Sequence, residues 1–580
     1  MESILQLFTN PTGDVTLLSV YHTVLRIAIP VLALVIVYRC ARSLLGFRRE
    51  PEIWAWLRVV TGELLPVTHW ENVIGRKKTA DICLDLAMIS KNHAVLTRYD
   101  NGSWTIRDIG ERGHVFVNGE QIQSCRVAYG DTISLNGVEM VLEPVSSQEA
   151  HLQSQGRTRA GKGNSPGLTL VLLTVMQLMT LLELCLNLDP EKMLTVALAF
   201  GELLALEWVL FIGQKIIRRS GFEVETVAFF LMTFGLCIIA SKAPEDLQKQ
   251  MLTACAGVVL FLVIGLFLRN LEAAKRIRYV AATAGLLLLA VNLVFGREIY
   301  GARNWIQLGG FSFQPSELVK ICFIFAGAST MERIVTKRNL ILFIAYAAFV
   351  CGCLALMRDF GTALIFFTCF LVISYLRSGS YAALVLMIAA VAFAAVLAIQ
   401  FFPYIAARFA AWGHIWEDPL GKGYQQTNAL MCIASGGLFG LGLGNGWLKY
   451  VAAADTDLVF AFLCEEAGLI VACLTIAALA LLGLFVVRSA KVGRSSFYTI
   501  SACAAMSIMM VQAILNVFGT VDFLPLTGVT FPFVSHGGSS MIACWGLLAF
   551  VKACDTRQNA SFAVKLTERR HRKGREGAAA

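Results

Sequence analysis

The sequence predicts a polytopic α-helical membrane protein with about 13 spans and one inserted all-β domain. Of its 580 residues, 57% are hydrophobic and only 15% are charged. The mean hydropathy is +0.65, and a chain with so few polar side chains cannot cover its own surface in water. From residue 53 to residue 144 the long apolar runs give way to short runs separated by turn signals, which is typical of a β-sandwich.

The distribution of basic residues and cysteines excludes several other classes of protein. The net charge is +9, but Lys and Arg lie in short clusters between apolar runs, as the positive-inside rule expects. Nucleic acid is therefore not a predicted partner. The 16 cysteines lie mostly inside apolar runs and form no CxxC pair, so we expect neither a disulfide framework nor a structural metal site.

The first span is expected at residues 17–38, within an N-terminal anchor of residues 1–50. This apolar run is long enough to cross a bilayer. No Lys or Arg precedes Arg26, whereas four arginines follow the run between positions 39 and 49. The positive-inside rule then places the N-terminus outside the cell and the next segment in the cytoplasm.

The cytoplasmic β-sandwich is expected at residues 51–145. Three motifs in it resemble those of forkhead-associated (FHA) domains: Gly75-Arg76, the SxxH motif from Ser90 to His93, and the run from Asp108 to Gly119. FHA domains bind phosphothreonine peptides. The resemblance implies that the phosphate is contacted by Arg76, Ser90 and Lys91. A guanidinium can pair with phosphate through two hydrogen bonds and a hydroxyl can add another, whereas His93 is expected to be structural.

One departure from the FHA pattern leaves a second interpretation open. Residues 111–114 read Glu-Arg-Gly-His, where FHA domains usually have Ser-Thr-Asn-Gly. The Asn that commonly holds the backbone of the ligand is therefore missing. The domain either still binds phosphothreonine or is a degenerate FHA domain that only docks a partner protein.

A polar linker, residues 146–167, leads into a membrane domain expected at residues 168–555. Basic clusters alternate between its apolar runs, which predicts that the loops near 300, 359, 402–456 and 520–537 lie outside and that the basic tail, residues 556–580, is cytoplasmic. Helices are expected to start near residues 168, 193, 222, 250, 279, 316, 339, 361, 381, 457, 498 and 538.

Four polar motifs on the predicted outer side carry the functional signal. They begin at Gly301 (GARNWIQLGGFSFQPSELVK), Arg358 (RDFGT), Ala411 (AWGHIWEDPLGKGYQQ) and Leu524 (LPLTGVTFPFVSHGGSS). In this order they resemble the SEDS family (shape, elongation, division and sporulation), which includes RodA, FtsW and SpoVE. Members of that family polymerise lipid II, an undecaprenyl-pyrophosphate-linked disaccharide pentapeptide, into peptidoglycan.

The SEDS resemblance implies that Asp418, just before a Gly-Tyr-Gln motif, is the catalytic residue. Making a β-1,4 glycan from an α-linked lipid pyrophosphate inverts the anomeric carbon, so a base must deprotonate the attacking 4-hydroxyl. A carboxylate that is partly buried near the membrane surface would suit this role. Glu417 is the competing carboxylate and is expected to be a solvated neighbour.

The leaving pyrophosphate needs positive charge near it, either from side chains or from a divalent cation such as Mg²⁺ or Mn²⁺. No cofactor is certain. An ion pair between Lys320 and Asp359 across two helices is an alternative role for the lysine, because an unpaired charge is costly inside a bundle. The predicted contacts with lipid II come from Arg303, Trp305, Lys320, Lys422, Tyr424 and Gln425.

The resemblance also implies a function, a location and partners. The expected protein is a peptidoglycan glycosyltransferase at the outer face of the bacterial cytoplasmic membrane, for cell-shape, division or sporulation wall synthesis. Its expected partners are a class B penicillin-binding protein and a phosphothreonine-containing protein. A lipid II flippase and a catalytically inactive scaffold that signals through its FHA domain are the alternatives.

Several departures limit the SEDS resemblance. Asn304 and His536 replace the usual Arg and Tyr of the family, and Ala-rich sequence precedes Asp455 and Asp457. Five helices are expected between the linker and Gly301, where the family usually has three, so two helices before residue 279 have no predicted role.

Overall fold

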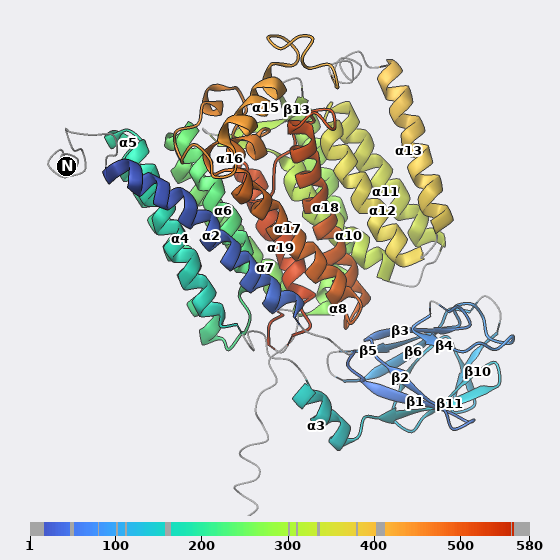
Figure 1. The fold of residues 1–580 in the computed structure, drawn as a ribbon. Coiled ribbons are helices and arrows are strands. Elements are labelled where there is room, and N and C mark those ends of the chain that lie inside the picture. The colour runs from blue at the N-terminus through green and yellow to red at the C-terminus, as the bar shows by residue number, and fades with distance from the viewer. Residues whose placement is uncertain are drawn as a thin grey trace, which may run out of the picture.

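The computed structural model consists of a helical bundle with a β-sandwich at one end (Figure 1). We call this end of the bundle the sandwich end and the opposite end the loop end. The predicted features at residues 1–16 and in the basic tail beyond residue 561 lie outside the described residues. The structure describes residues 17–46, 51–78, 80–99, 102–110, 113–156, 164–299, 302–308, 311–332, 337–378, 381–401, 412–557 and 559–561.

Within the described residues, ten helices are long and apolar enough to cross a membrane. The class of a polytopic helical membrane protein is therefore confirmed, whereas the predicted count of about 13 spans is not. These helices are α2 (Leu17–Leu45), α4 (Pro166–Asn187), α5 (Pro190–Ile216), α6 (Glu223–Lys242), α7 (Leu247–Phe267), α9 (Arg278–Phe295), α11 (Lys337–Leu356), α12 (Phe360–Ser378), α17 (Leu469–Ala490) and α18 (Ser496–Thr520).

Shorter or additional helices fill the spaces between the ten. The helix that was expected to start near residue 457 is divided, because Gly468 adopts a left-handed conformation with φ of 91° between α16 and α17. The other helices in the described residues are α3 (Ser147–Gly156), α8 (Leu271–Arg276), α10 (Pro315–Glu332), α13 (Tyr381–Phe401), α15 (Tyr424–Gly436), α16 (Val459–Glu466) and α19 (Gly538–Ala553).

Helix α6 is the buried centre of the first part of the bundle. Its apolar residues surround the whole helix rather than one face, and all residues of its central span are buried. It contacts α2, α4, α5, α17 and α19. Five long helices, α4 to α7 and α9, lie between the linker and residue 300, as predicted.

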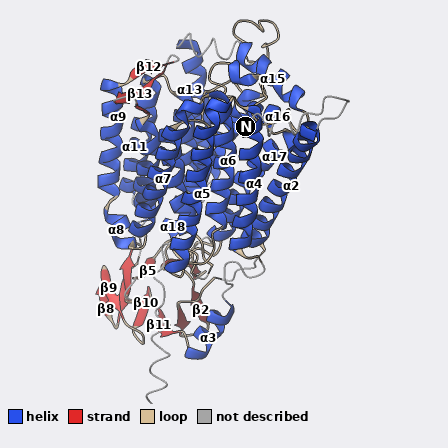
Figure 2. Cartoon of the chain, turned by 90° about the vertical axis from the view of Figure 1, so that its left-hand side faces the viewer, coloured by secondary structure: helices blue, strands red, loops and turns tan. Residues whose placement is uncertain are grey.

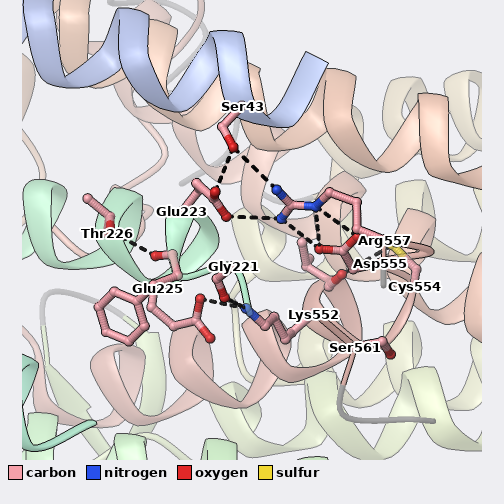
Figure 3. A network of polar contacts seen from close by, with 12 residues as sticks. Ser43, Gly221, Glu223, Glu225, Thr226, Lys552, Cys554, Asp555, Arg557 and Ser561 are labelled. Atoms are coloured by element: carbon pink, nitrogen blue, oxygen red, sulfur yellow. Dashed lines mark hydrogen bonds and ion pairs between the residues drawn. The ribbon is translucent and has the colours of Figure 1, made fainter. Parts of the chain in front are cut away.

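A buried ionic network joins α2 and α6 to the residues at the end of α19, at the sandwich end (Figure 3). The guanidinium of Arg557 lies 3.1 Å from Glu223 Oε2 and 2.7 Å from Asp555 Oδ2. Ser43 on α2 donates to the other oxygen of Glu223 at 2.6 Å. Lys552 pairs with Glu225 at 2.9 Å. Because each buried charge has an opposite partner, the network holds α2, α6 and the end of α19 together.

Helix α18 runs from the sandwich end to the loop end. At its start the Ser495 hydroxyl accepts a hydrogen bond from the N–H of Phe497 at 3.3 Å, a normal N-cap. At its other end the N–H of Phe523 donates to the carbonyl of Phe518 at 2.9 Å, and Asp522 adopts a left-handed conformation with φ of 57°. This is the arrangement in which many helices end.

The sandwich consists of two packed sheets with strand orders β2-β1-β11-β10-β7-β8 and β4-β3-β5-β6-β9. Alternate residues of the strands point inward, so Leu57, Ile74, Leu96 and Leu142 are fully buried between the sheets. The strands are β1 (Ala55–Val59), β2 (Leu64–Val67), β3 (Glu71–Gly75), β4 (Ile82–Cys83), β5 (Ala94–Arg98), β6 (Trp104–Asp108), β7 (Val115–Val117), β8 (Glu120–Ile122), β9 (Ser124–Val127), β10 (Thr132–Leu135) and β11 (Val138–Pro144).

The sandwich docks on the residues that precede α18. Arg494 pairs with Glu52 at 3.0 Å, and its carbonyl accepts a hydrogen bond from the N–H of Trp70 at 2.7 Å. The ring of Trp70 packs edge-on against Tyr498 with centroids 6.2 Å apart, and Ser495 donates to Glu71 at 3.1 Å. These contacts combine an ion pair with an aromatic pair, so they fix the sandwich against the bundle.

A small sheet at the loop end was not expected from the sequence. Its strands are β12 (Arg297–Ile299), β13 (Ala302–Leu308) and β14 (Phe311–Phe313), all antiparallel. They include half of the first polar motif, which was expected to be an outer loop. The strands hold Arg303, Asn304 and Trp305 at the surface end of the bundle.

Candidate functional site

Residues 412–426, here called the Asp418 loop, consist of an irregular segment at the loop end and the first residues of α15, which begins at Tyr424 (Figure 1). The Asp418 carboxylate accepts a hydrogen bond from the N–H of Lys422 at 3.1 Å, and its carbonyl accepts one from Gly423 at 3.1 Å. A Cβ at Gly421 would collide with this carboxylate, and one at Gly423 would collide with the carbonyl of Ile415. The two glycines therefore allow the loop to fold tightly around Asp418.

The expectation that Asp418 is partly buried is wrong. Its side chain is exposed, whereas the side chains of Ile415 and Gln426 in the same loop are buried. Glu417 is also exposed, as predicted, and lies 2.9 Å from His414 Nδ1. The two adjacent carboxylates thus differ in their contacts: Glu417 faces a histidine, whereas Asp418 is bound by the backbone of its own loop.

Three predicted substrate contacts lie in the same loop as Asp418. Lys422 and Tyr424 are exposed, while Gln425 donates to the carbonyl of Ala452 at 3.0 Å. The structure therefore brings Asp418, a cation and an aromatic side chain together on one surface segment. Their proximity follows from the sequence, since all of them lie within a few residues of each other.

Arg303 and Trp305 lie on β13, at the same end of the bundle as the Asp418 loop but on another side of it (Figure 2). Arg303 is exposed, and its N–H donates to the carbonyl of Met357 at 2.9 Å. Within the part of the chain that the structure describes, no hydrogen bond or ion pair links either residue to Asp418. The two motifs lie at the same end of the membrane domain.

The predicted ion pair between Lys320 and Asp359 is not formed. Lys320 is 1% exposed, and its Nζ lies 2.6 Å from Glu317 Oε1, one turn earlier on α10. Asp359 instead accepts hydrogen bonds from Asn304 at 2.8 Å and Gln314 at 3.4 Å. A nearer carboxylate on the same helix competes with the cross-helix partner. Lys320 is therefore buried and neutralised rather than open to a substrate.

A second polar cluster at the loop end combines three distant segments. Asp455 lies 3.1 Å from Lys242 at the end of α6 and 2.7 Å from His536 Nδ1. Burial disfavours the charged carboxylate, but the hydrogen bond from His536 and the charge of Lys242 hold the pKa of Asp455 below its usual value. The sequence singled out Asp455 and His536 separately but gave no signal that they pair.

Glu465 and Glu466, which the sequence analysis did not select, have a structural role. Glu466 accepts hydrogen bonds from the N–H groups of Gly444 at 3.0 Å and Gly446 at 3.2 Å. Glu465 accepts from those of Trp447 and Leu448, each at 2.9 Å. Both carboxylates thus bind the Gly-rich segment that follows α15. Two adjacent acids inside an apolar helix are the signal that could have predicted such a contact.

The three predicted phosphate contacts of the sandwich lie on two adjacent loops. The N–H of Arg76 donates to the carbonyl of Ser90 at 3.0 Å, and Lys91 is exposed next to it. His93 is fully buried and its Nδ1 accepts a hydrogen bond from the N–H of Ser90 at 3.2 Å, which confirms its structural role. The departure at residues 111 and 112 lies outside the described residues.

The sequence left a divalent cation open as a possible cofactor. No group of three or more His, Cys, Asp or Glu side chains that could hold a metal ion occurs in the ranges that the structure describes. A divalent cation at this site would have to depend on fewer protein ligands together with phosphate oxygens of a substrate.

The fold and the loop-end surface define a multi-pass membrane protein whose ionisable loop lies at one end and whose β-sandwich lies at the other. Comparison with known families is consistent with both parts. The family described as cell cycle proteins, FtsW/RodA/SpoVE, matches residues 225–560, and the FHA domain family matches residues 72–136. The chain belongs to the FtsW/RodA/SpoVE family, which confirms the predicted SEDS and FHA resemblances.

Two named relatives agree with this assignment, and one solved structure is also similar. The peptidoglycan glycosyltransferase RodA of Mycobacterium bovis is 33% identical over 327 residues, which cover 52% of this chain and 69% of the relative. The probable peptidoglycan glycosyltransferase FtsW of Bacillus subtilis is 29% identical over 393 residues, covering 62% and 95%. A solved structure described as "Structural coordination of polymerization and crosslinking by a peptidoglycan synthase complex" is 27% identical, with a TM-score of 0.47 and coverage of 57% and 95%.

Proposed function

We propose that this protein is a peptidoglycan glycosyltransferase that polymerises lipid II at the loop end of its bundle. The observation that carries the proposal is the exposed carboxylate of Asp418, presented by a tightly folded loop in a chain of the FtsW/RodA/SpoVE family. The names of its relatives, peptidoglycan glycosyltransferases RodA and FtsW, support the reaction class.

In the proposed reaction Asp418 is the general base. It accepts the proton of the attacking 4-hydroxyl while the oxygen of that group forms a bond to the anomeric carbon of the donor. The bond from this carbon to the pyrophosphate breaks on the opposite face, and the pyrophosphate leaves with the bonding electrons, so the configuration inverts. An exposed carboxylate can reach a hydroxyl on a substrate held outside the bundle, which a buried one could not.

Positive charge for the leaving group is proposed to come from Lys422 in the Asp418 loop and from Arg303 on β13. Both side chains are exposed at the loop end, so both can reach a phosphate at the level of the lipid head groups. Tyr424, Gln425 and Trp305 complete the proposed contact surface. Lys320 is left out of it, because its ammonium is buried against Glu317.

In the proposed orientation the loop end faces the outside of a bacterial cytoplasmic membrane, and the sandwich end faces the cytoplasm. The alternation of basic clusters along the sequence supports this topology. A transpeptidase of the class B penicillin-binding protein type would then cross-link the strands on the outer side. The FHA domain would bind a phosphothreonine-containing protein in the cytoplasm through Arg76, Ser90 and Lys91.

The function is tested by incubating the detergent-solubilised protein with fluorescent lipid II and a class B penicillin-binding protein. We expect a ladder of glycan products that muramidase digests, and no ladder with Asp418→Ala. A flippase would move lipid II between two compartments and make no glycan, and a detergent solution has only one compartment. The absence of any ladder from the unmutated protein would therefore favour the flippase or the inactive scaffold.

A further inference from the structure

Asp522, at the end of α18, is a second carboxylate next to the Asp418 loop. Its φ of 57° lies in the left-handed region, where glycine is favoured and where Asp is tolerated at some cost. The helix end requires this conformation, because the N–H groups of Phe523 and Leu524 both donate to the carbonyl of Phe518, at 2.9 and 3.0 Å. Glycine would adopt this backbone conformation more easily than aspartate. The role of the Asp522 carboxylate therefore lies in the groups that it binds.

The Asp522 carboxylate contacts both ends of the Asp418 loop. At the first end it accepts a hydrogen bond from the N–H of Gly413, at 3.2 Å to Oδ2 and 3.3 Å to Oδ1. At the other end it accepts one from the amide of Gln426 at 3.3 Å. Asp418 lies between these two attachment points in the sequence. A single side chain therefore joins the beginning and the end of the loop.

Two further hydrogen bonds strengthen the same junction. Trp412 donates from Nε1 to the carbonyl of Phe523 at 3.3 Å, and the buried amide of Gln426 also donates to the carbonyl of Gly519 at 3.1 Å. The three acceptor groups, the Asp522 carboxylate and the carbonyls of Gly519 and Phe523, belong to the last turn of α18 or to the residues directly after it. Fixing both ends of a loop at one rigid point removes most of the conformations that would otherwise be open to its tip.

We propose that Asp522 is a positioning residue for the glycosyltransferase reaction. Its carboxylate clamps the two ends of the Asp418 loop to the end of α18 and thereby fixes where Asp418 meets the acceptor hydroxyl. Asp522 takes no proton and contacts no substrate in this role. The inference rests on the proposed function, since a fixed position for Asp418 matters only if Asp418 takes part in the reaction.

The test compares Asp522→Gly with Asp522→Asn in the full-length protein. Glycine keeps the left-handed backbone and removes the clamp, whereas asparagine keeps an acceptor oxygen and tolerates the same conformation. We expect Asp522→Gly to lower kcat for lipid II about 10- to 100-fold, the effect of a small misplacement, with little change in KM, and Asp522→Asn to recover most of the rate. The control Asp246→Asn, which removes a partly exposed carboxylate at the same end, should keep the rate of the unmutated protein.

Hydrogen exchange distinguishes positioning from general loss of structure. We expect the amides of residues 412–426 to exchange faster in Asp522→Gly while those of α18 stay protected. Unchanged kcat in Asp522→Gly, or lower kcat without faster exchange in the loop, would overturn the inference. If Asp418→Ala retains full activity, the proposed function itself fails; if Asp418→Ala is inactive and Asp522→Gly is fully active, only the role of Asp522 is wrong.

Discussion

Lys320 forms its ion pair with Glu317 on the same helix, at 2.6 Å, and both side chains are almost completely buried. The pair lies at the start of α10, within the polar motif that also carries Arg303. Its burial means that each charge depends on the other, because an isolated charge inside the bundle is poorly solvated.

The first prediction concerns this pair. Lys320→Met should lower the free energy of unfolding by about 3–5 kcal/mol, because it leaves the Glu317 carboxylate buried without a partner. Adding Glu317→Leu should restore most of the loss. Thermal unfolding in detergent measures both effects. The exposed pair of Lys249 and Asp246, with the same spacing and a 2.8 Å contact, is the control, and equal losses in Lys249→Met and Lys320→Met would contradict the account.

The second prediction follows from the lowered pKa of Asp455. A carboxylate whose pKa is lower in the folded than in the unfolded state stabilises the fold above its unfolded pKa, and this contribution disappears as the pH falls through the folded value. Asp455→Asn should therefore lower the midpoint of thermal unfolding at pH 7 and down to about pH 4, the usual pKa of Asp. Below that pH the midpoints of the two proteins should converge. A difference that grows towards low pH would refute the assignment.

The third prediction concerns docking of the sandwich. Arg494→Glu places two acids opposite each other, so it should weaken the contact with Glu52 and expose the interface. Limited proteolysis should then release the sandwich faster, and the exchanged pair Arg494→Glu with Glu52→Arg should restore protection. Arg58→Ala, which breaks an exposed pair within the sandwich, is the control. Unaltered proteolysis in Arg494→Glu would show that the ion pair does not hold the domain.

The fourth prediction tests the FHA site. Arg76→Ala should abolish binding of a phosphothreonine peptide that the unmutated full-length protein binds, because the guanidinium supplies the paired hydrogen bonds to the phosphate. Isothermal titration calorimetry with the phosphorylated and unphosphorylated peptides measures this. Arg126→Ala, on the exposed face of β9, should bind normally. No binding by the unmutated protein would indicate that the departure at residues 111–114 has disabled the site.

Local patterns in the sequence were sufficient to predict the class of the protein and its two domains. Long apolar runs and short alternating runs can be recognised from neighbouring residues alone. The structure has helices where the long apolar runs occur and strands where the short runs occur. The Asp418 loop could also be recognised from the sequence, since its glycines, its acids and Tyr424 are close together along the chain. The exposure of Asp418 could not be predicted in this way, because burial depends on how distant segments pack around the loop.

One of the remaining errors concerns a local contact, and the other contacts that were missed join distant segments. Lys320 was assigned to Asp359 across two helices, although Glu317 lies three residues away, where side chains of one helix meet. The pairing of Asp455 with His536 and the clamp at Asp522 join segments that lie far apart in the sequence. No periodicity or motif reveals such contacts, so only the folded structure identifies them.

The central claim, that the exposed carboxylate of Asp418 is the base of a glycan polymerase, is tested most directly by two matched substitutions. Asp418→Asn and Glu417→Gln each remove one negative charge from adjacent, exposed positions and preserve the shape of the side chain. The initial rate of lipid II polymerisation should fall at least about 100-fold in Asp418→Asn, the usual effect of losing a general base, and stay close to that of the unmutated protein in Glu417→Gln. Full activity of Asp418→Asn, or equal losses in both variants, would contradict the claim.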